Sequence, residues 1–170
     1  FDGIESLTVA DDGRAYLLDV PERIQVLGLD GRVQAQIASP DPVEADADAA
    51  GRLYAAAGDT VYAYGADGKP LWDSRLHAAA PGADPEVVAL AWDASAGELL
   101  ALEAAGKRLY RLSPAGELLG QEAMRAKDAT QAVWTDLVVG PDGGRWALDA
   151  AVPQIRGWDR FGRLQQEVPL

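Results

Sequence analysis

The sequence contains no cysteine and no asparagine, and only one histidine and one methionine among its 170 residues. Without cysteine the chain forms no disulfide, no thiolate metal site and no cysteine nucleophile. It also has no run of about 18 apolar residues, so we expect no membrane insertion within this segment. Because the chain starts at Phe1 without a methionine, we expect a processed product or part of a larger chain. We also expect a location outside the cytoplasm, in the periplasm or secreted, with a cytoplasmic location as the alternative.

Positive charge is also scarce. The chain has three lysines, a formal net charge of -12 and a pI near 4.4. Proteins gain most of their non-specific affinity for nucleic acid from lysine and arginine side chains that neutralise phosphates. Anionic membrane surfaces attract the same side chains. The sequence therefore predicts no nucleic-acid partner and a solvated acidic surface.

The chain does contain enough apolar residues for a packed core. Hydrophobic residues make up 48% of the sequence, and a chain of this length buries about 70% of the surface that it exposes when unfolded. We expect a single domain over residues 1–170.

Glycines recur at a fixed distance from aliphatic residues, and this is the strongest pattern in the chain. An aliphatic residue precedes a glycine by seven positions at four places: Ile24–Gly31, Val61–Gly68, Leu109–Gly116 and Ile155–Gly162. Another glycine precedes each pair, at Gly13, Gly51, Gly97 and Gly143. Both sets step by roughly forty residues, a period typical of solenoids and propellers.

Each repeat has the pattern of a four-stranded meander. Short segments with apolar residues at every second position alternate with Asp-Gly or Ala-Gly turns. The sequence predicts an all-β protein, a β-propeller of four four-stranded antiparallel blades at about residues 4–39, 42–77, 86–124 and 134–169. We expect either a closed small ring or a four-blade portion of a larger propeller.

Two segments depart from the common pattern. The first strand of the second repeat has Ala45 and Ala47 where the first and fourth repeats have leucine and valine, so we expect it to be the least protected first strand. Good helix formers at 122–129 give an alternative expectation of a short helical turn there.

The repeats resemble NHL-type repeats, with some similarity to quinoprotein-like and gluconolactonase-like propeller repeats. The best match is LTVADDGRAYLLDVPERIQVLGLDGR, from Leu7 to Arg32, and LVVGPDGGRWALD and QIRGWDRFGR in the fourth repeat are similar. TVYAYGADGKPLW in the second repeat is closer to the quinoprotein-like form. The resemblance implies a propeller, an architecture that many unrelated activities share.

The gluconolactonase-like resemblance implies a metal held by glutamate, asparagine and aspartate, a set that this sequence cannot supply without asparagine. We expect no catalytic residues and no cofactor. The weak candidates for an oxygen-rich calcium site are Glu44, Asp46 and Asp48, which a strand would place on one face, together with Asp136. The alternative is that these carboxylates pair with Arg14 or Arg52 or face solvent.

Three residues are candidates for contact with a protein partner. Most of the five tryptophans occupy repeat positions that fill the space between blades, but Trp134 follows an irregular segment and would be an anchor if exposed. Trp72 is the second candidate. His77, the single histidine, lies in the segment RLHAAAPG, which we interpret as a solvated loop.

These observations favour a non-enzymatic interaction or scaffold propeller, a subunit or domain of a larger assembly that binds a protein partner. Two alternatives remain open. One is a hydrolase or lactonase fragment whose catalytic residues lie on missing blades. The other is a propeller that binds a sugar or another small ligand.

Overall fold

The computed structural model describes residues 3–10, 12–19, 23–76, 85–104, 107–124 and 132–170. These residues form sixteen β-strands in four sheets, and no helix in the described part of the chain has the length and apolarity needed to cross a membrane. The predicted fold class is therefore confirmed: the protein is all-β, with four antiparallel four-stranded sheets.

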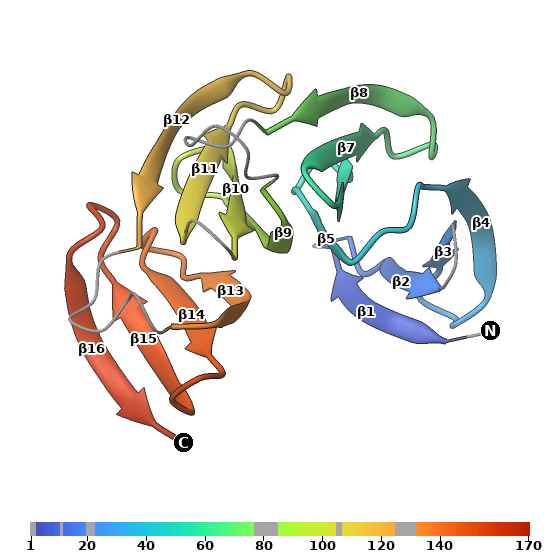
Figure 1. Cartoon of the computed structure of the whole chain (residues 1–170). Helices are drawn as coiled ribbons and strands as arrows, with labels where there is room; N and C mark the ends of the chain where they lie inside the picture. The colour runs from blue at the N-terminus through green and yellow to red at the C-terminus, as the bar shows by residue number, and fades with distance from the viewer. Residues whose placement is uncertain (1–2, 11, 20–22, 77–84, 105–106, 125–131) are drawn as a thin grey trace. The chain divides into compact units, whose positions relative to one another are not determined.

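The sheets follow one another along the chain, and we name them blades one to four (Figure 1). Blade one consists of β1 (Ile4–Val9), β2 (Ala15–Asp19), β3 (Arg23–Leu27) and β4 (Val33–Ala38). Blade two consists of β5 (Glu44–Ala47), β6 (Leu53–Ala57), β7 (Thr60–Tyr64) and β8 (Pro70–Arg75). Blade three consists of β9 (Val87–Asp93), β10 (Glu98–Glu103), β11 (Arg108–Leu112) and β12 (Leu118–Ala123). Blade four consists of β13 (Trp134–Val139), β14 (Arg145–Asp149), β15 (Gln154–Trp158) and β16 (Leu164–Pro169).

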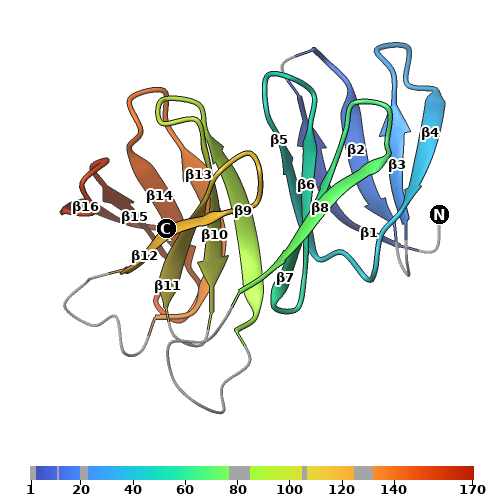
Figure 2. The same cartoon turned by 90° about the horizontal axis from the view of Figure 1, so that it is seen from above.

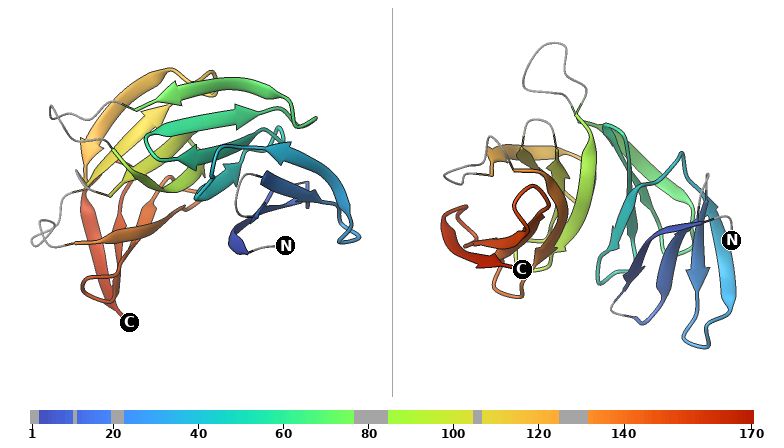
Figure 3. Two further views of the ribbon diagram at one scale, coloured as in Figure 1. Left: turned by 45° about the vertical axis from the view of Figure 1, so that its right-hand side comes forward. Right: turned by 60° about the horizontal axis from the view of Figure 1, so that its bottom comes forward.

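Within each blade the strands pair in sequence order, so every blade is a simple meander, as Figure 2 shows for blade one. The strands twist as β-sheets normally do (Figure 3). No described strand pairs with a strand of another blade. The blades are thus complete from first to last strand, and backbone hydrogen bonds join none of the four sheets to another.

The turns explain the glycine pattern. All eight glycines of the two sets have positive φ, between 68° and 85°, namely Gly13, Gly31, Gly51, Gly68, Gly97, Gly116, Gly143 and Gly162. At Gly13 the backbone N–H donates to the carbonyl of Ala10 at 2.8 Å, and Asp12 Oδ1 accepts from the N–H of Arg14 at 3.0 Å. Glycine adopts this backbone conformation without steric cost, and aspartate closes the turn with its side chain.

The chain divides into two compact units, Phe1–Leu76 (unit 1, blades one and two) and His77–Leu170 (unit 2, blades three and four). Each is described by itself. The expected single domain and its blade boundaries stay predictions.

In unit 1 the two blades pack face to face around a core of aliphatic and tyrosine side chains. Blade one contributes Tyr16, Leu18 and Ile24, and blade two contributes Ala45 and Leu53. The innermost strands β1 and β5 also exchange side-chain hydrogen bonds. Ser6 Oγ donates to Glu44 Oε1 at 2.7 Å, and Thr8 Oγ1 donates to Asp46 Oδ1 at 3.2 Å.

In unit 2 larger apolar side chains fill the same kind of interface. Leu100 and Leu102 of blade three pack with Trp134, Leu137 and Ala147 of blade four. The rings of Trp134 and Trp158 meet edge to face with centroids 5.5 Å apart. Aromatic side chains bury large apolar areas, so the two tryptophans account for a large part of this interface.

Two local expectations are answered in part. Glu122 and Ala123 belong to β12, so the helical turn expected at 122–129 does not begin there, and residues 125–131 of that segment lie outside the described residues. The first strand of blade two, β5, has four residues and is the shortest strand of the described chain. Its Ala45 is nevertheless 3% exposed and belongs to the core.

Candidate functional site

A hollow lined by three aromatic residues lies in unit 1, and we call it the aromatic groove. It has a volume of about 380 Å³ and lies between the end of blade one and strands β7 and β8 of blade two. Its lining residues are Ala38, Pro40, Tyr62, Ala63, Tyr64, Pro70, Leu71, Trp72 and Asp73. Aromatic, proline and leucine side chains beside one carboxylate form a surface that suits an apolar ligand with a polar or cationic group.

The strand register places the groove's side chains. Tyr62 of β7 lies opposite Asp73 of β8, which brings a half-buried phenol beside an exposed carboxylate on one face. Leu71 also lines the groove and is 51% exposed. Tyr64 is buried, and its hydroxyl bonds with the Ser39 hydroxyl at 3.0 Å. Tyr64 therefore fixes the floor, while Tyr62, Leu71 and Asp73 face a ligand.

A second hollow, the arginine cleft, lies within unit 2 and has a volume of about 360 Å³. Its lining residues are Asp93, Ser95, Ala96, Glu98, Arg111, Glu122, Arg145, Arg160 and Phe161. Two arginines are already paired: Arg111 binds Glu98 through two contacts of 2.7 Å, and Arg145 pairs with Glu122. The Glu98 partner holds the pKa of Arg111 above its ordinary value.

The third arginine of this cleft differs from the other two. Among the residues that the structure describes, no carboxylate pairs with Arg160, whose guanidinium carbon lies 4.9 Å from the ring centroid of Phe161. The buried Nε of Arg145 also has no hydrogen-bond partner within the described chain. The cleft therefore offers one exposed cation beside an exposed ring.

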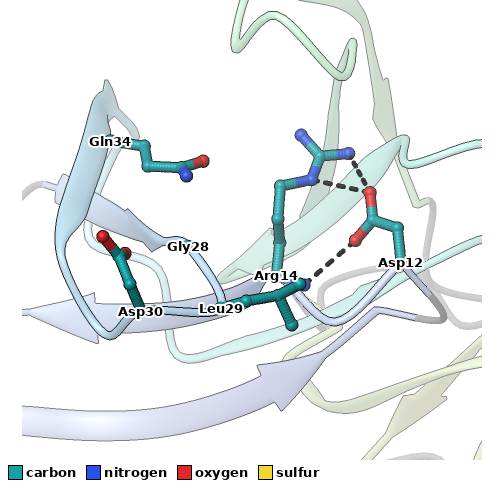
Figure 4. A pocket seen from close by; sticks show the side chains of 6 residues that line it. All are labelled: Asp12, Arg14, Gly28, Leu29, Asp30 and Gln34. Atoms are coloured by element: carbon teal, nitrogen blue, oxygen red, sulfur yellow. Dashed lines mark hydrogen bonds and ion pairs between the residues drawn. The ribbon is translucent and has the colours of Figure 1, made fainter.

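A third hollow, of about 400 Å³, lies on blade one and is lined by Asp12, Arg14, Gly28, Leu29, Asp30 and Gln34 (Figure 4). Its charged groups hold the turns together. Arg14 Nε donates to Asp12 at 2.7 Å, and Arg14 Nη1 donates to the carbonyl of Ala66 in blade two at 2.9 Å. Asp30 accepts from the backbone of Arg32 at 3.1 Å. We therefore assign this hollow a structural role.

The candidate metal ligands do not come together. Glu44 and Asp46 accept hydrogen bonds from β1 and from the backbone of the next residue. Asp48 lies beyond the end of β5, where it is buried against Arg52 at 2.6 Å and Tyr54 at 2.9 Å. Asp136 accepts from the backbone of Leu137 at 2.7 Å. In the described ranges no group of three metal-ligating side chains is arranged to hold an ion.

The three candidate partner contacts have different positions. Trp134 is 1% exposed, so the exposure on which its role as an anchor depended is absent. The reason is a register shift between Trp134 and Asp136, which turns the tryptophan toward blade three together with Leu137. Trp72 contributes to the aromatic groove, and its ring lies 5.9 Å from that of Tyr54. His77 lies outside the described residues.

Buried aspartates pair with arginines, and the sequence suggested only one of these pairs. Asp48 binds Arg52 at 2.6 Å, which agrees with the alternative to a metal site, whereas the equivalent pair of the buried Asp19 with Arg23, also at 2.6 Å, was missed. The repeated spacing of aspartate and arginine at the end of a strand was the available signal. In unit 2 the fully buried Arg156 lies 3.3 Å from Asp149. These two residues are further apart in the sequence than the pairs of unit 1, so their spacing gives no such signal.

Comparisons with known proteins identify the fold. No protein-family model and no curated protein matches the sequence. Among solved structures, virginiamycin B lyase from Staphylococcus aureus matches with a TM-score of 0.76 and 15% identity, over 99% of this chain and 56% of that one. A streptogramin B lyase matches with a TM-score of 0.77 and 16% identity, over 99% and 55%. Kuenenia stuttgartiensis hydrazine synthase matches with a TM-score of 0.78 and 10% identity, over 99% and 49%.

At these identities the likeness shows the fold alone, and the chain spans about half the length of the structures that it matches. The four sheets are propeller blades, whereas membership in the NHL repeat family is not confirmed. The expectation that the chain is not an enzyme is wrong. Two of these structural neighbours are lyases, so this fold gives no reason to exclude an enzyme. The blades thus belong to an architecture that includes enzymes.

Proposed function

We propose that this chain is a propeller part that recognises an extended segment of a protein partner in the aromatic groove of unit 1. The observation that carries the proposal is that Tyr62, Leu71 and Asp73 line one groove, in which Tyr62 lies opposite Asp73. Extended, proline-containing peptides bind grooves lined by aromatic side chains because they lose little conformational entropy on binding.

The chemistry of the groove favours a segment with a lysine or arginine. A guanidinium or ammonium group that lies over the Tyr62 ring gains a cation–π interaction. From that position its charged end reaches Asp73, which is exposed and lies opposite Tyr62. Leu71 and Pro40 then contact the aliphatic part of the same side chain.

Long-range charge supports the same partner. The whole chain has a formal net charge of -12, and Asp41, which follows the groove residue Pro40 in the sequence, is exposed. An acidic surface accelerates association with a basic partner and repels an acidic one.

The test is a set of four fluorescein-labelled pentapeptides with the frame Pro-Leu-X-Leu-Pro, in which X is arginine, lysine, glutamine or glutamate. We expect the arginine peptide to bind the whole chain about tenfold tighter than the glutamate peptide, as measured by fluorescence anisotropy. Asp73→Asn should remove most of that difference, and Tyr62→Ala should weaken the arginine peptide most.

Glu117→Gln is the matched control, since it removes one exposed carboxylate from unit 2. It should leave the preference for arginine unchanged. Equal affinities for all four peptides, or equal effects of Asp73→Asn and Glu117→Gln, would contradict the proposal.

The arginine cleft supports a second candidate function, the binding of a small oxyanion beside Arg160 and Phe161. Titration with acetate and with inorganic phosphate, followed by amide chemical shifts, tests it. Shifts of residues 159–162 that Arg160→Gln abolishes and Arg32→Gln preserves would support it. Shifts that are equal in both variants would refute it, because Arg32 is an exposed arginine of blade one.

A further inference from the structure

Two blade faces are apolar and open. One is the face of blade one that points away from blade two, and the other is the face of blade four that points away from blade three. A face of this kind on a soluble protein marks a contact surface. We call them the blade-one face and the blade-four face.

The blade-one face is formed by the inner strand β1 and its neighbour. Leu7 and Val9 are 58% and 61% exposed. They lie opposite Leu17 and Ala15 of β2 in the register of the sheet. The alternate residues Ser6 and Thr8 point the other way and bind blade two.

The blade-four face has a matching position. Val138 of β13 is 57% exposed and lies opposite Trp146 of β14. Leu148 and Ile155 lie opposite each other on the same face and are half-buried. The exposed Asp136 lies opposite Leu148 on this face, and together with Leu137 and Ala147 these residues line a hollow of about 140 Å³.

The repeat positions show whether each face matches a surface that packs against the next blade or one that packs against the preceding blade. Counted from the turn glycines, Trp146 and Leu148 correspond to Tyr16 and Leu18, which pack against blade two in unit 1. The equivalent positions in unit 2 are Leu100 and Leu102, which pack against blade four. The blade-four face therefore matches the surfaces of blades one and three that pack against the next blade along the chain.

The blade-one face matches the opposite surface, the one that packs against the preceding blade. By the same count Leu7 and Val9 correspond to Ala45 and Ala47 of blade two, which pack against the preceding blade. Leu137 of blade four occupies the equivalent position and is buried against blade three. By repeat position, the blade-four face thus matches surfaces that pack on a following blade, and the blade-one face matches surfaces that pack on a preceding blade.

We propose that the blade-four face of one copy of this chain packs on the blade-one face of a second copy, in the way that blades pack within each unit. The pairing is heterologous, since two different surfaces meet. The repeat supports a second copy as the occupant. By repeat position, each of the two open faces is the surface that packs against the other one within a unit, so the chain carries both halves of the contact.

Sedimentation velocity on the 170-residue chain over a wide concentration range tests this proposal. We expect a species of at least twice the monomer mass that dissociates on dilution. Val9→Glu and Val138→Glu each place a charge on one of the two faces, and each variant alone should be monomeric. Leu118→Glu, at an exposed position on the outermost strand β12, is the control and should associate like the unsubstituted chain.

Mixing the two variants gives the decisive result. The Val9→Glu copy keeps its blade-four face and the Val138→Glu copy keeps its blade-one face, so the mixture should form a one-to-one dimer. Circular dichroism confirms that each variant is folded. A monomeric unsubstituted chain at all concentrations would overturn the proposal, as would association that survives both substitutions. A mixture of folded variants that stays monomeric would overturn the heterologous pairing.

Discussion

The two units pair their blades in different ways. In unit 1 the inner strands carry small and polar side chains, with Ala45 and Ala47 on one face and the bonds from Ser6 to Glu44 and from Thr8 to Asp46 beside them. In unit 2 the inner strand β13 carries Trp134 and Leu137, and both are buried in the core.

The difference shows that the repeat specifies the meander but not the contents of the interface between blades. Glycine and aspartate fix the turns in both units because the backbone conformation there requires them. On the inner strands, unit 1 has two hydrogen bonds and small residues, whereas unit 2 has Trp134 and Leu137. Unit 2 should therefore depend more on single residues than unit 1.

Trp134→Ala should have the largest effect. It removes a side chain that is 1% exposed and contacts Trp158, and such truncations cost about 3–5 kcal/mol of unfolding free energy. Trp72→Ala in unit 1 is the control, with an expected cost below about 2 kcal/mol because Trp72 is half-buried. Urea denaturation measures both, and equal costs would break the comparison.

Asp149→Asn should have the next largest effect. Arg156 and Asp149 are both fully buried, and removing the Asp149 charge leaves Arg156 with the partly exposed Glu167, 3.4 Å away, at a cost of about 3 kcal/mol. In unit 1 the matching change, Asp48→Asn, should cost less, since 32% of the Arg52 side chain is exposed and water can solvate it. A larger cost for Asp48→Asn in the same denaturation experiment would contradict this account.

Alkaline pH should weaken unit 1 more than unit 2. Burial raises the pKa of Tyr16, Tyr54 and Tyr64 in unit 1, and a hydrogen bond to Asp48 adds to the effect at Tyr54. In unit 2 burial raises the pKa of Tyr110 alone among the described tyrosines. A tyrosine whose pKa is raised in the folded state stabilises the fold fully when the pH is below the pKa of the unfolded chain, near 10. This stabilisation is lost as the pH rises from there through the pKa of the folded state.

Tyrosinate absorbance measures this titration directly. Replacing Tyr16, Tyr54 or Tyr64 by phenylalanine should each remove one late-titrating group, and Tyr110→Phe should remove the only one in unit 2. The prediction fails if these four groups ionise near pH 10 in the folded protein.

Hydrogen exchange should show the smallest difference between the units. The four-residue strand β5 buries alanines, whereas β13 buries Trp134 and Leu137. Amide protons of β5 should therefore exchange faster than those of β13 under native conditions. If β5 is the slowest of the four inner strands, the small residues of unit 1 do not weaken it.

The fold was predictable from the sequence because turn chemistry is local. Gly13, Gly51, Gly97 and Gly143 adopt positive φ, and the strands that follow them begin within two residues. The position of Trp134 was not predictable, since a one-residue register shift reverses the face to which a side chain points.

The site was less predictable than the fold. Trp72 was a candidate, but Tyr62 and Asp73 become neighbours only through the register of β7 with β8. Alternation along a strand also suggested one acidic face for Glu44, Asp46 and Asp48. The strand ends at Ala47, and Asp48 turns to Arg52 instead.

The central claim is that in-phase repeats form blades that pack through their inner strands. The absence of native cysteine allows a direct test with Ser6→Cys and Glu44→Cys together, because these side chains meet at 2.7 Å across blades one and two. A short bifunctional thiol reagent should link this pair within one chain. It should not link Ser6→Cys with Asp73→Cys, which places the second thiol on the outermost strand β8. Equal linking of both pairs, or none at Ser6 and Glu44, would contradict the claim.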